Sequence, residues 1–292
     1  MKVLVIGASG LVGGNFLKVF WDDRKYTIQG THLNNAAPLT AYFNTTDPSD
    51  PENFDVAAFD PDLIVHAGAM THVDACEDQP AQSHLHTVSS TENMVDLART
   101  CGAKMIYIST DYVFDGEDGP YTEEASPNPQ SIYGEHKLEA EQKISSALND
   151  YLILRITNVY GEERQGKNFI LRLINNLLKG AVDELPLPFD QYATPINAFD
   201  VARAAKKLVE NDHQGIFHLG STDYMNRCQL ASRVLSYFPN HGATITPHST
   251  RALNQRAKRP LQGGLKSEKF LRLFPDFTFS NVDDFLSYHM GE

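Results

Sequence analysis

Cysteine is scarce in this chain of 292 residues. The three cysteines, Cys76, Cys101 and Cys228, are an odd number and lie far apart, so they indicate neither a disulfide framework nor a Cys-x-x-Cys metal pair. This usage favours a reducing compartment. The sequence also lacks any run of about 18 to 20 apolar residues, the length that spans a bilayer. No membrane partner is expected.

Positive charge is in short supply as well. Lys and Arg total 25 against 37 Asp and Glu, a formal net charge of -12 that would repel a phosphate backbone. Nucleic acid is therefore not an expected partner. The first residues form an apolar run after Lys2, but glycines at 7, 10, 13 and 14 interrupt it where the core of a signal peptide stays apolar. We expect a cytoplasmic protein.

Short aliphatic runs alternate with longer amphipathic stretches along the chain. The continuous apolar runs predict strands buried on both faces, at residues 2–6, 26–31, 63–67, 104–109 and 151–156. The stretches between them predict helices, at residues 11–20, 51–59, 80–101 and 129–149. Such an alternation indicates an α/β fold with a doubly wound parallel sheet of the Rossmann type.

The alternation loosens after about residue 158. Residues 1–157 are predicted to form a dinucleotide-binding domain, to which residues 196–220 return, and residues 158–292 a smaller C-terminal lobe. Within that lobe we expect a proline-containing loop at 179–195 and a helix at 228–237. Ligands of open α/β sheets bind at the carboxyl ends of the strands, so this lobe should close over that edge and bind the substrate.

A glycine-rich segment directly follows the first predicted strand. Its spacing is GxxGxxG, which differs from the GxGxxG of the usual dinucleotide fingerprint. Glycines here permit a tight turn, let the backbone approach a pyrophosphate and allow the helix to pack closely on the strand. The segment predicts dinucleotide contacts at Gly7, Ser9, Gly10, Leu11, Val12 and Gly13.

Tyr133 and Lys137 stand four residues apart at the start of a predicted helix, so their side chains can share one face. An ammonium beside a phenol favours the phenolate and should lower the tyrosine pKa towards the working pH. A solvated tyrosine and lysine on a helix surface are the alternative that this spacing alone leaves open. Thr110, where the predicted strand at 104–109 ends, adds a hydroxyl beside the ligand crevice.

In combination, these motifs resemble the extended short-chain dehydrogenases/reductases, and within them the dTDP-4-dehydrorhamnose reductase family. The matching segments run in order through nearly the whole chain: the three spaced glycines, Ser-Thr-Asp-Tyr-Val-Phe-Asp-Gly at 109–116, Tyr-Gly-Glu-His-Lys at 133–137 and Arg-Pro at 259–260. The resemblance implies a catalytic set of Thr110, Tyr133 and Lys137. It implies hydride transfer from the nicotinamide to the C4 ketone of a nucleotide-linked 6-deoxysugar, while Tyr133 protonates the oxygen and Thr110 orients it.

The same resemblance implies further contacts. Lys137 would also bind the nicotinamide ribose. The remaining cofactor contacts are expected at Thr31, His32, Asp47, Ala67, Gly68 and Ala69. The substrate contacts are expected at Thr71, Val73, Asp111, Asn158 and Arg259. A nucleotide sugar is the expected partner, and a homodimer stays open. The histidines match no standard ligand spacing, so no metal site is expected.

Three positions depart from the family pattern. Asn158 stands where the family usually has a tryptophan, so the pocket loses a stacking surface and should prefer a different or more polar ligand. Thr87 replaces a common asparagine, a change that bears on the proton-relay water. Thr194-Pro195-Ile196 replaces the Pro-Thr pair of the family, which predicts a remodelled loop on the substrate side.

The end of the second predicted strand bears on the choice of cofactor. A carboxylate there would accept the hydroxyls of the adenosine ribose and repel a 2′-phosphate, but the strand ends in Gly30, Thr31 and His32. We therefore favour NADP(H), with NAD(H) as the alternative. His32 as an ordinary loop histidine also stays open.

Two other functions remain open. One is another nucleotide-sugar enzyme, such as an epimerase, dehydrogenase or dehydratase with tightly bound NAD; dehydratases carry an acidic pair beside the threonine, whereas here Asp111 is followed by Tyr112. The other is a non-catalytic, NADP-binding regulatory subunit like that of methionine adenosyltransferase. The intact Thr-Tyr-Lys set disfavours this last function.

Overall fold

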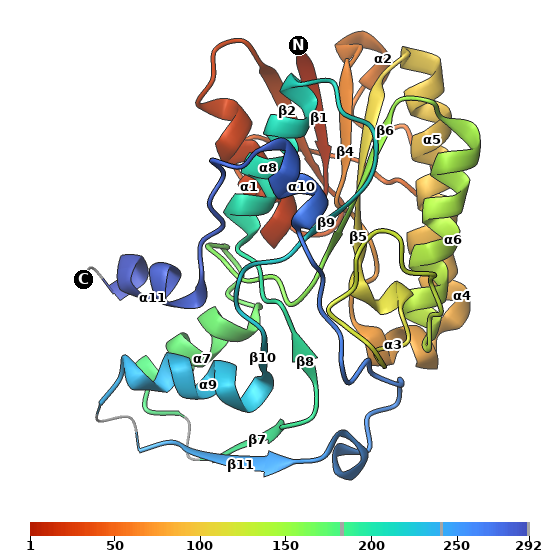
Figure 1. Ribbon diagram of the computed structural model, residues 1–292. Helices are drawn as coiled ribbons and strands as arrows, with labels where there is room; N and C mark the ends of the chain where they lie inside the picture. The colour runs from red at the N-terminus through yellow and green to blue at the C-terminus, as the bar shows by residue number, and fades with distance from the viewer. Residues whose placement is uncertain (182–183, 240–241, 291–292) are drawn as a thin grey trace.

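The structure is a computed structural model that describes residues 1–181, 184–239 and 242–290. At its centre lies a seven-stranded sheet with the order β3-β2-β1-β4-β5-β6-β9, in which all neighbouring strands are parallel (Figure 1). The strands are β1 Lys2–Ile6, β2 Thr27–His32, β3 Thr40–Tyr42, β4 Leu63–His66, β5 Lys104–Thr110, β6 Tyr151–Ile156 and β9 Gly215–Leu219. The predicted Rossmann-type sheet is confirmed.

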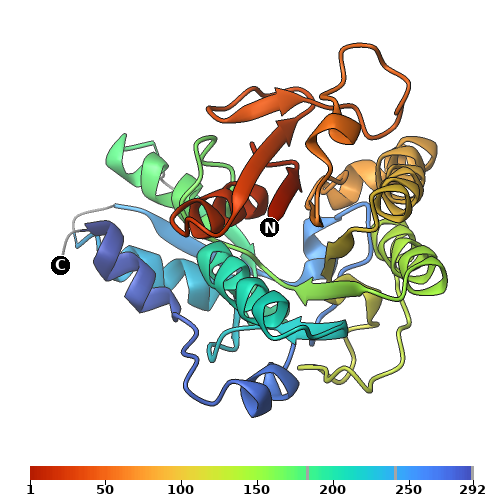
Figure 2. The ribbon, with the colours of Figure 1, turned by 90° about the horizontal axis from the view of Figure 1, so that it is seen from above.

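Helices cover both faces of this sheet (Figures 1 and 2). One face carries α1 Leu11–Trp21, α8 Ala198–Glu210 and α10 Glu268–Leu273, whose apolar side chains share a core with the sheet. The other carries α5 Ser90–Cys101 and α6 Ile132–Ala147, with α2 Val56–Phe59 at its edge. Because the central strands are buried on both faces, their sequences are continuous apolar runs rather than alternating ones.

Several predicted helices differ in their limits. The predicted helix at 51–59 is only α2, since the Asp55 side chain accepts a hydrogen bond from the Ala58 N–H and starts the helix there. The stretch from 80 to 101 is helical throughout but contains a π-helical turn, Leu85–Ser89, between α4 Pro80–His84 and α5. The predicted helix at 129–149 begins later, at Ile132, where Ser131 caps α6.

Some elements were not predicted at all. β3 and β9 extend the two edges of the sheet, and α3 Val73–Asp78 follows β4. A short 3-10 helix, Asp111–Val113, follows β5, and another spans Thr250–Leu253. None of the helices that the structure describes combines the length and the apolar character needed to cross a bilayer.

Residues after β6, apart from α8, β9 and α10, build a smaller lobe at the carboxyl ends of the strands, in the lower part of Figure 1. Its elements are α7 Phe169–Leu178, β7 Glu184–Pro188, β8 Tyr192–Ala193, β10 Met225–Asn226, α9 Arg227–Ser236, β11 Thr244–His248 and α11 Val282–Met290. β7 pairs with β11 and β8 with β10. The predicted loop at 179–195 therefore contains two short strands, and its residues 182–183 lie outside the described residues. The predicted helix at 228–237 corresponds to α9.

Candidate active site

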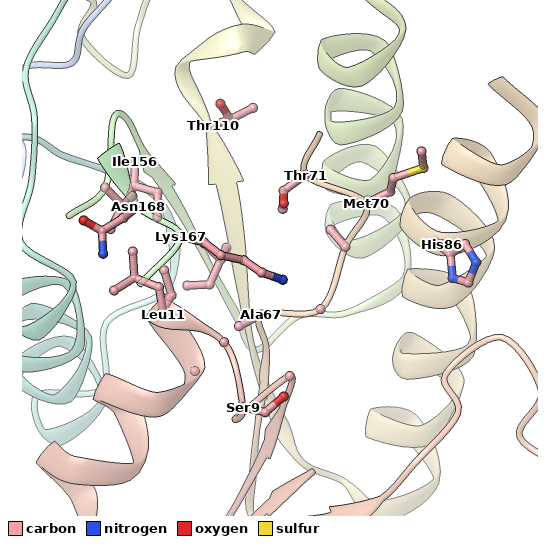
Figure 3. A pocket seen from close by; sticks show the side chains of 18 of the residues that line it. Ser9, Leu11, Ala67, Met70, Thr71, His86, Thr110, Ile156, Lys167 and Asn168 are labelled. Carbon is pink, nitrogen blue, oxygen red and sulfur yellow. The ribbon is translucent and has the colours of Figure 1, made fainter. Parts of the chain in front are cut away.

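A cavity of about 810 Å³ opens at the carboxyl ends of β1, β4, β5 and β6, between the sheet and the C-terminal lobe (Figure 3). Its walls come from the turn after β1, the segments after β4 and β5, the start of α6 and the loop between β6 and α7. The predicted residues of the turn after β1 that line it are Gly7, Ser9, Gly10, Leu11, Val12 and Gly13. Those after β4 are Ala67, Gly68, Ala69, Thr71 and Val73. The other predicted residues that line it are Thr110, Asp111, Tyr133, Lys137 and Asn158.

The glycines after β1 differ in the space that a side chain would find at each position. A β-carbon on Gly13 would lie 2.4 Å from the Gly7 carbonyl oxygen, and one on Gly7, whose φ is 76°, would lie 3.0 Å from the Gly68 nitrogen. A β-carbon on Gly10 would meet only ordinary contact, at 3.4 Å. α1 starts with no side-chain cap, so its first N–H groups stay available. The turn fits the pyrophosphate of a dinucleotide.

His32 ends β2 and lines the cavity. Its Nδ1 lies 2.8 Å from the Thr40 hydroxyl, which holds the ring at this edge. Leu33, Asn34 and Asn35 continue the lining from the same loop. In the described part of this loop, no carboxylate lines the cavity, so nothing there would repel a 2′-phosphate.

Three predicted contact residues lie outside the cavity lining. Thr31 is fully buried beneath the site. Asp47 is exposed, and its carboxylate accepts hydrogen bonds from the N–H and hydroxyl of Ser49. Arg259 forms an ion pair with Asp74 at 2.7 Å. The structure therefore keeps Thr31 and Asp47 away from the other predicted site residues, whereas Arg259 lies behind the lining, with its guanidinium 6.0 Å from the centroid of the Tyr112 ring.

Lys137 is buried on α6, one turn after Tyr133. Its Nζ donates a hydrogen bond to the Ile108 carbonyl oxygen at 2.5 Å and lies 4.0 Å from the centroid of the Tyr107 ring. Burial lowers the pKa of Lys137 to about 7, and the carboxylate of Glu141 acts in the opposite direction. The ammonium is thus held over the end of β5, at the floor of the cavity.

Tyr133 faces Thr110 and packs edge-on against Tyr112, with ring centroids 5.5 Å apart. Burial raises the pKa of Tyr133 above its ordinary value, and hydrogen bonding with the Thr110 side chain opposes this change. The expected lowering of the pKa by Lys137 is wrong for this structure, because desolvation of the phenolate dominates. Tyr133 is therefore protonated at neutral pH in this structure, and burial by itself makes it a weaker acid than a free tyrosine.

Asp111 lines the cavity, but its carboxylate is already engaged. Oδ2 accepts hydrogen bonds from the Thr157 hydroxyl at 2.7 Å and from the Gly264 N–H at 3.1 Å. Burial raises the pKa of Asp111, while these hydrogen bonds act in the opposite direction. Asp111 therefore connects the ends of β5 and β6 to the C-terminal segment, beside Thr110.

Sequence reasoning missed several residues of the lining. They include Thr45, His86, Glu163, Lys167 and Arg227. Figure 3 shows the Lys167 side chain pointing into the cavity from the loop before α7. A lysine between Gly166 and the helix cap Asn168 was an available signal. Nothing in the local pattern marks Arg227, which reaches the site from the first turn of α9.

Across residues 1–181, 184–239 and 242–290, no three His, Cys, Asp or Glu side chains gather as ligands for a metal ion. The cavity instead combines a phosphate-binding turn with a hydroxyl, a phenol and an ammonium at the carboxyl edge of the sheet. The family described as RmlD substrate binding domain matches residues 1–280. This chain belongs to that family.

The relatives of this RmlD-family chain include proteins of two kinds. The dTDP-4-dehydrorhamnose reductase of Sinorhizobium fredii is 33% identical over 73% of this chain and 75% of the relative. Methionine adenosyltransferase 2 subunit beta of Mus musculus is 30% identical over 84% of this chain and 75% of the relative. The structure also resembles that of dTDP-4-dehydrorhamnose reductase from Bacillus anthracis in complex with NADP, with a TM-score of 0.85, 25% identity and coverage of 98% and 97% of the two chains. The family resemblance stated from the sequence is confirmed.

Proposed function

We propose that this protein is an NADP(H)-dependent reductase of a nucleotide-linked 4-keto-6-deoxysugar, similar to dTDP-4-dehydrorhamnose reductase. The observation that carries the proposal is the meeting of Thr110, Tyr133 and Lys137 at one cavity with the glycine-rich turn after β1. The likeness to the reductases of Sinorhizobium fredii and Bacillus anthracis supports the reaction. NAD(H) is the alternative cofactor.

The three side chains have different tasks in the proposed reaction. The nicotinamide, when bound, supplies the hydride to the carbonyl carbon. Tyr133, kept protonated by burial, donates its proton to the carbonyl oxygen. Thr110, at the end of β5 beside that hydroxyl, orients the oxygen by hydrogen bonding. Lys137 binds the nicotinamide ribose and, from the next helical turn, holds positive charge near the phenol as the proton leaves.

The preference for NADP(H) rests on the end of β2. His32, Asn34 and Asn35 present neutral or basic groups to the cavity there. A 2′-phosphate would find hydrogen-bond donors at this edge, and the N–H groups that start α1 would bind the pyrophosphate. Thr31 and Asp47 are the predicted cofactor contacts that this placement supports least.

In this proposal the two lobes bind different ligands. Residues 1–157, together with residues 196–220, would hold the dinucleotide, and the rest of 158–292, apart from α10 on the main sheet, would cover the sugar. This division is supported by the position of α8 and β9 in the main sheet layer and by a separate apolar core under α7 and α9. Both lobes contribute to the cavity.

The test is oxidation of NADPH and NADH by the purified protein with a panel of nucleotide-linked 4-keto-sugars that includes dTDP-4-dehydrorhamnose. Tyr133→Phe should lower turnover by at least about a hundredfold and leave dinucleotide affinity within a few-fold. Tyr288→Phe, at a tyrosine with 79% exposure, is the matched control and should change neither. Absence of oxidation with every sugar, or full turnover by Tyr133→Phe, would overturn the proposal.

A cofactor-binding regulatory subunit is the second candidate. The likeness to methionine adenosyltransferase 2 subunit beta over 84% of this chain favours it. Such a protein would bind NADP(H) through the same turn, show no turnover in the panel and copurify with a partner enzyme. Turnover that depends on Tyr133 decides against it.

A further inference from the structure

We propose that Arg227 and Asn158 form an oxyanion-binding subsite that anchors the substrate beside the reacting carbon. The inference deepens the proposed function and rests on it for the identity of the substrate. Arg227 is the first residue of α9 and is partly buried at the wall of the cavity. Its Nη2 donates a hydrogen bond to the side-chain oxygen of Asn158 at 2.5 Å. The guanidinium lies 5.0 Å from the centroid of the Phe169 ring, which supports one of its faces.

Arg227 differs from the other sheltered arginines in its partners. Arg155 forms an ion pair with Glu141, and Arg259 with Asp74. Within the part of the chain that the structure describes, Arg227 has no carboxylate at ion-pairing distance. A guanidinium carries five N–H donors in a planar fork, and the amide oxygen of Asn158 uses only part of them. Its remaining donors suit an oxyanion, which a planar guanidinium binds through two parallel hydrogen bonds.

The surroundings of Arg227 favour an added negative charge. Burial lowers the pKa of Arg227, and the nearby cations Arg172 and Arg259 act in the same direction, against Tyr112 and Asp111. The Asp111 carboxylate is turned to its own hydrogen-bond donors, the Thr157 hydroxyl and the Gly264 N–H. A bound oxyanion would therefore be the counter-ion of Arg227, which no carboxylate in the described part of the chain provides at ion-pairing distance.

The Arg227–Asn158 pair lies near the place where the reacting carbon would bind. Asn158 lies two residues beyond Ile156, which is the register partner of Thr110 in the β5–β6 ladder. Its φ is 42°, in the left-handed region that asparagine tolerates better than most residues. From this turn the Asn158 amide holds Arg227 at the catalytic end of the cavity.

Two parts of a nucleotide sugar could supply the oxyanion. One is the diphosphate that joins the sugar to the nucleoside, and the other is a carboxylate on the sugar ring. Both offer paired oxygens to a planar guanidinium. Anchoring either of them next to Thr110 would limit how far the carbonyl can move from Tyr133.

The subsite itself is tested with inorganic pyrophosphate, titrated calorimetrically into protein that is saturated with NADP+. Arg227→Gln removes the charge, and Asn158→Asp supplies a competing carboxylate at nearly the same shape. Both should weaken pyrophosphate binding about tenfold or more. Arg24→Gln, at an exposed arginine before β2 and outside the cavity lining, is the matched control and should leave binding within about twofold. Equal NADP+ affinity in all variants shows that the fold is intact. Pyrophosphate affinity that is equal in all four proteins, or no binding to the unmodified protein, would overturn the subsite.

A second series identifies the source of the oxyanion, with dTDP, dTDP-glucose and dTDP-glucuronic acid as ligands. If Arg227 binds the diphosphate, Arg227→Gln weakens all three about equally. If it binds a sugar carboxylate, only dTDP-glucuronic acid is weakened. Loss of pyrophosphate binding in Arg227→Gln, combined with no affinity for any of the three ligands in the unmodified protein, would support the subsite and contradict the proposed substrate. If the unmodified protein is an active reductase and Arg227→Gln leaves its pyrophosphate affinity unchanged, the subsite is contradicted and the proposed function is not.

Discussion

Arg155 and Glu141 form a two-point ion pair behind the candidate catalytic lysine. The Arg155 Nη2 lies 2.6 Å from Glu141 Oε2 and its Nε lies 2.9 Å from Oε1, and both side chains are 3% exposed. Glu141 is one helical turn beyond Lys137 on α6, and the Ser109 hydroxyl also donates to it. The pair thus joins α6 to β5 and β6 directly under the site. It also neutralises the carboxylate whose charge acts on the buried ammonium of Lys137.

Breaking this pair should be costly to the fold. Arg155→Met leaves the Glu141 carboxylate buried without its cation, so the free energy of unfolding should fall by about 3 kcal/mol or more. The double variant Arg155→Met with Glu141→Gln removes both charges and should recover most of that loss. Arg233→Met breaks the exposed pair with Asp283 and should cost about 1 kcal/mol or less. Urea denaturation measures all three, and a double variant as unstable as the single one would contradict the account.

Lys137 should make the stability of the protein depend on pH. Its pKa is about 7 in the folded protein, below its ordinary value of 10.5. Between these values the unfolded chain binds the extra proton, so the contribution of this position to stability rises with pH through that window. The free energy of unfolding of Lys137→Met should therefore exceed that of the unmodified protein by more at pH 6 than at pH 9. The same variant should lose turnover. Urea denaturation at the two pH values measures the difference, and an equal gain at both would show that the lysine is not desolvated.

The glycines after β1 should separate cofactor binding from folding. Gly10→Val adds a side chain where the turn faces the cavity, so it should abolish dinucleotide binding and keep the fold. Gly13→Val places a β-carbon against the Gly7 carbonyl oxygen and should destabilise the fold itself. Dinucleotide titration and far-UV circular dichroism distinguish the two results. Normal affinity in Gly10→Val would remove this turn from the site.

The end of β2 should set the choice between the two dinucleotides. His32→Asp introduces a carboxylate that can accept the ribose hydroxyls and repels a 2′-phosphate. The ratio of NADP(H) to NAD(H) affinity should therefore fall by at least about tenfold. His32→Asn, which keeps the position neutral, is the control and should change the ratio much less. Titration of each variant with both cofactors gives the ratio, and an unchanged ratio in His32→Asp would place the adenosine ribose elsewhere.

Local patterns in the sequence determined the central sheet and the core of the site. The predicted limits of β1 and β6 coincide with the observed ones, because a strand buried on both faces is a continuous apolar run bounded by polar residues. The glycine-rich turn and the spacing of Tyr133 and Lys137 are equally local, since one turn and one helix face decide them. The short strands β7, β8, β10 and β11 escaped prediction because their pairing partners are distant in the sequence.

Only the tertiary structure decided which polar side chains meet inside the cavity. Asn158 and Arg227 are 69 residues apart in the chain, so no spacing rule links them; the fold places the start of α9 beside the segment that follows β6. The same holds for the Tyr133 pKa, where the sequence showed a nearby ammonium but not the desolvation that outweighs it. Burial and long-range contacts depend on how whole layers pack, and a local motif contains no information about either.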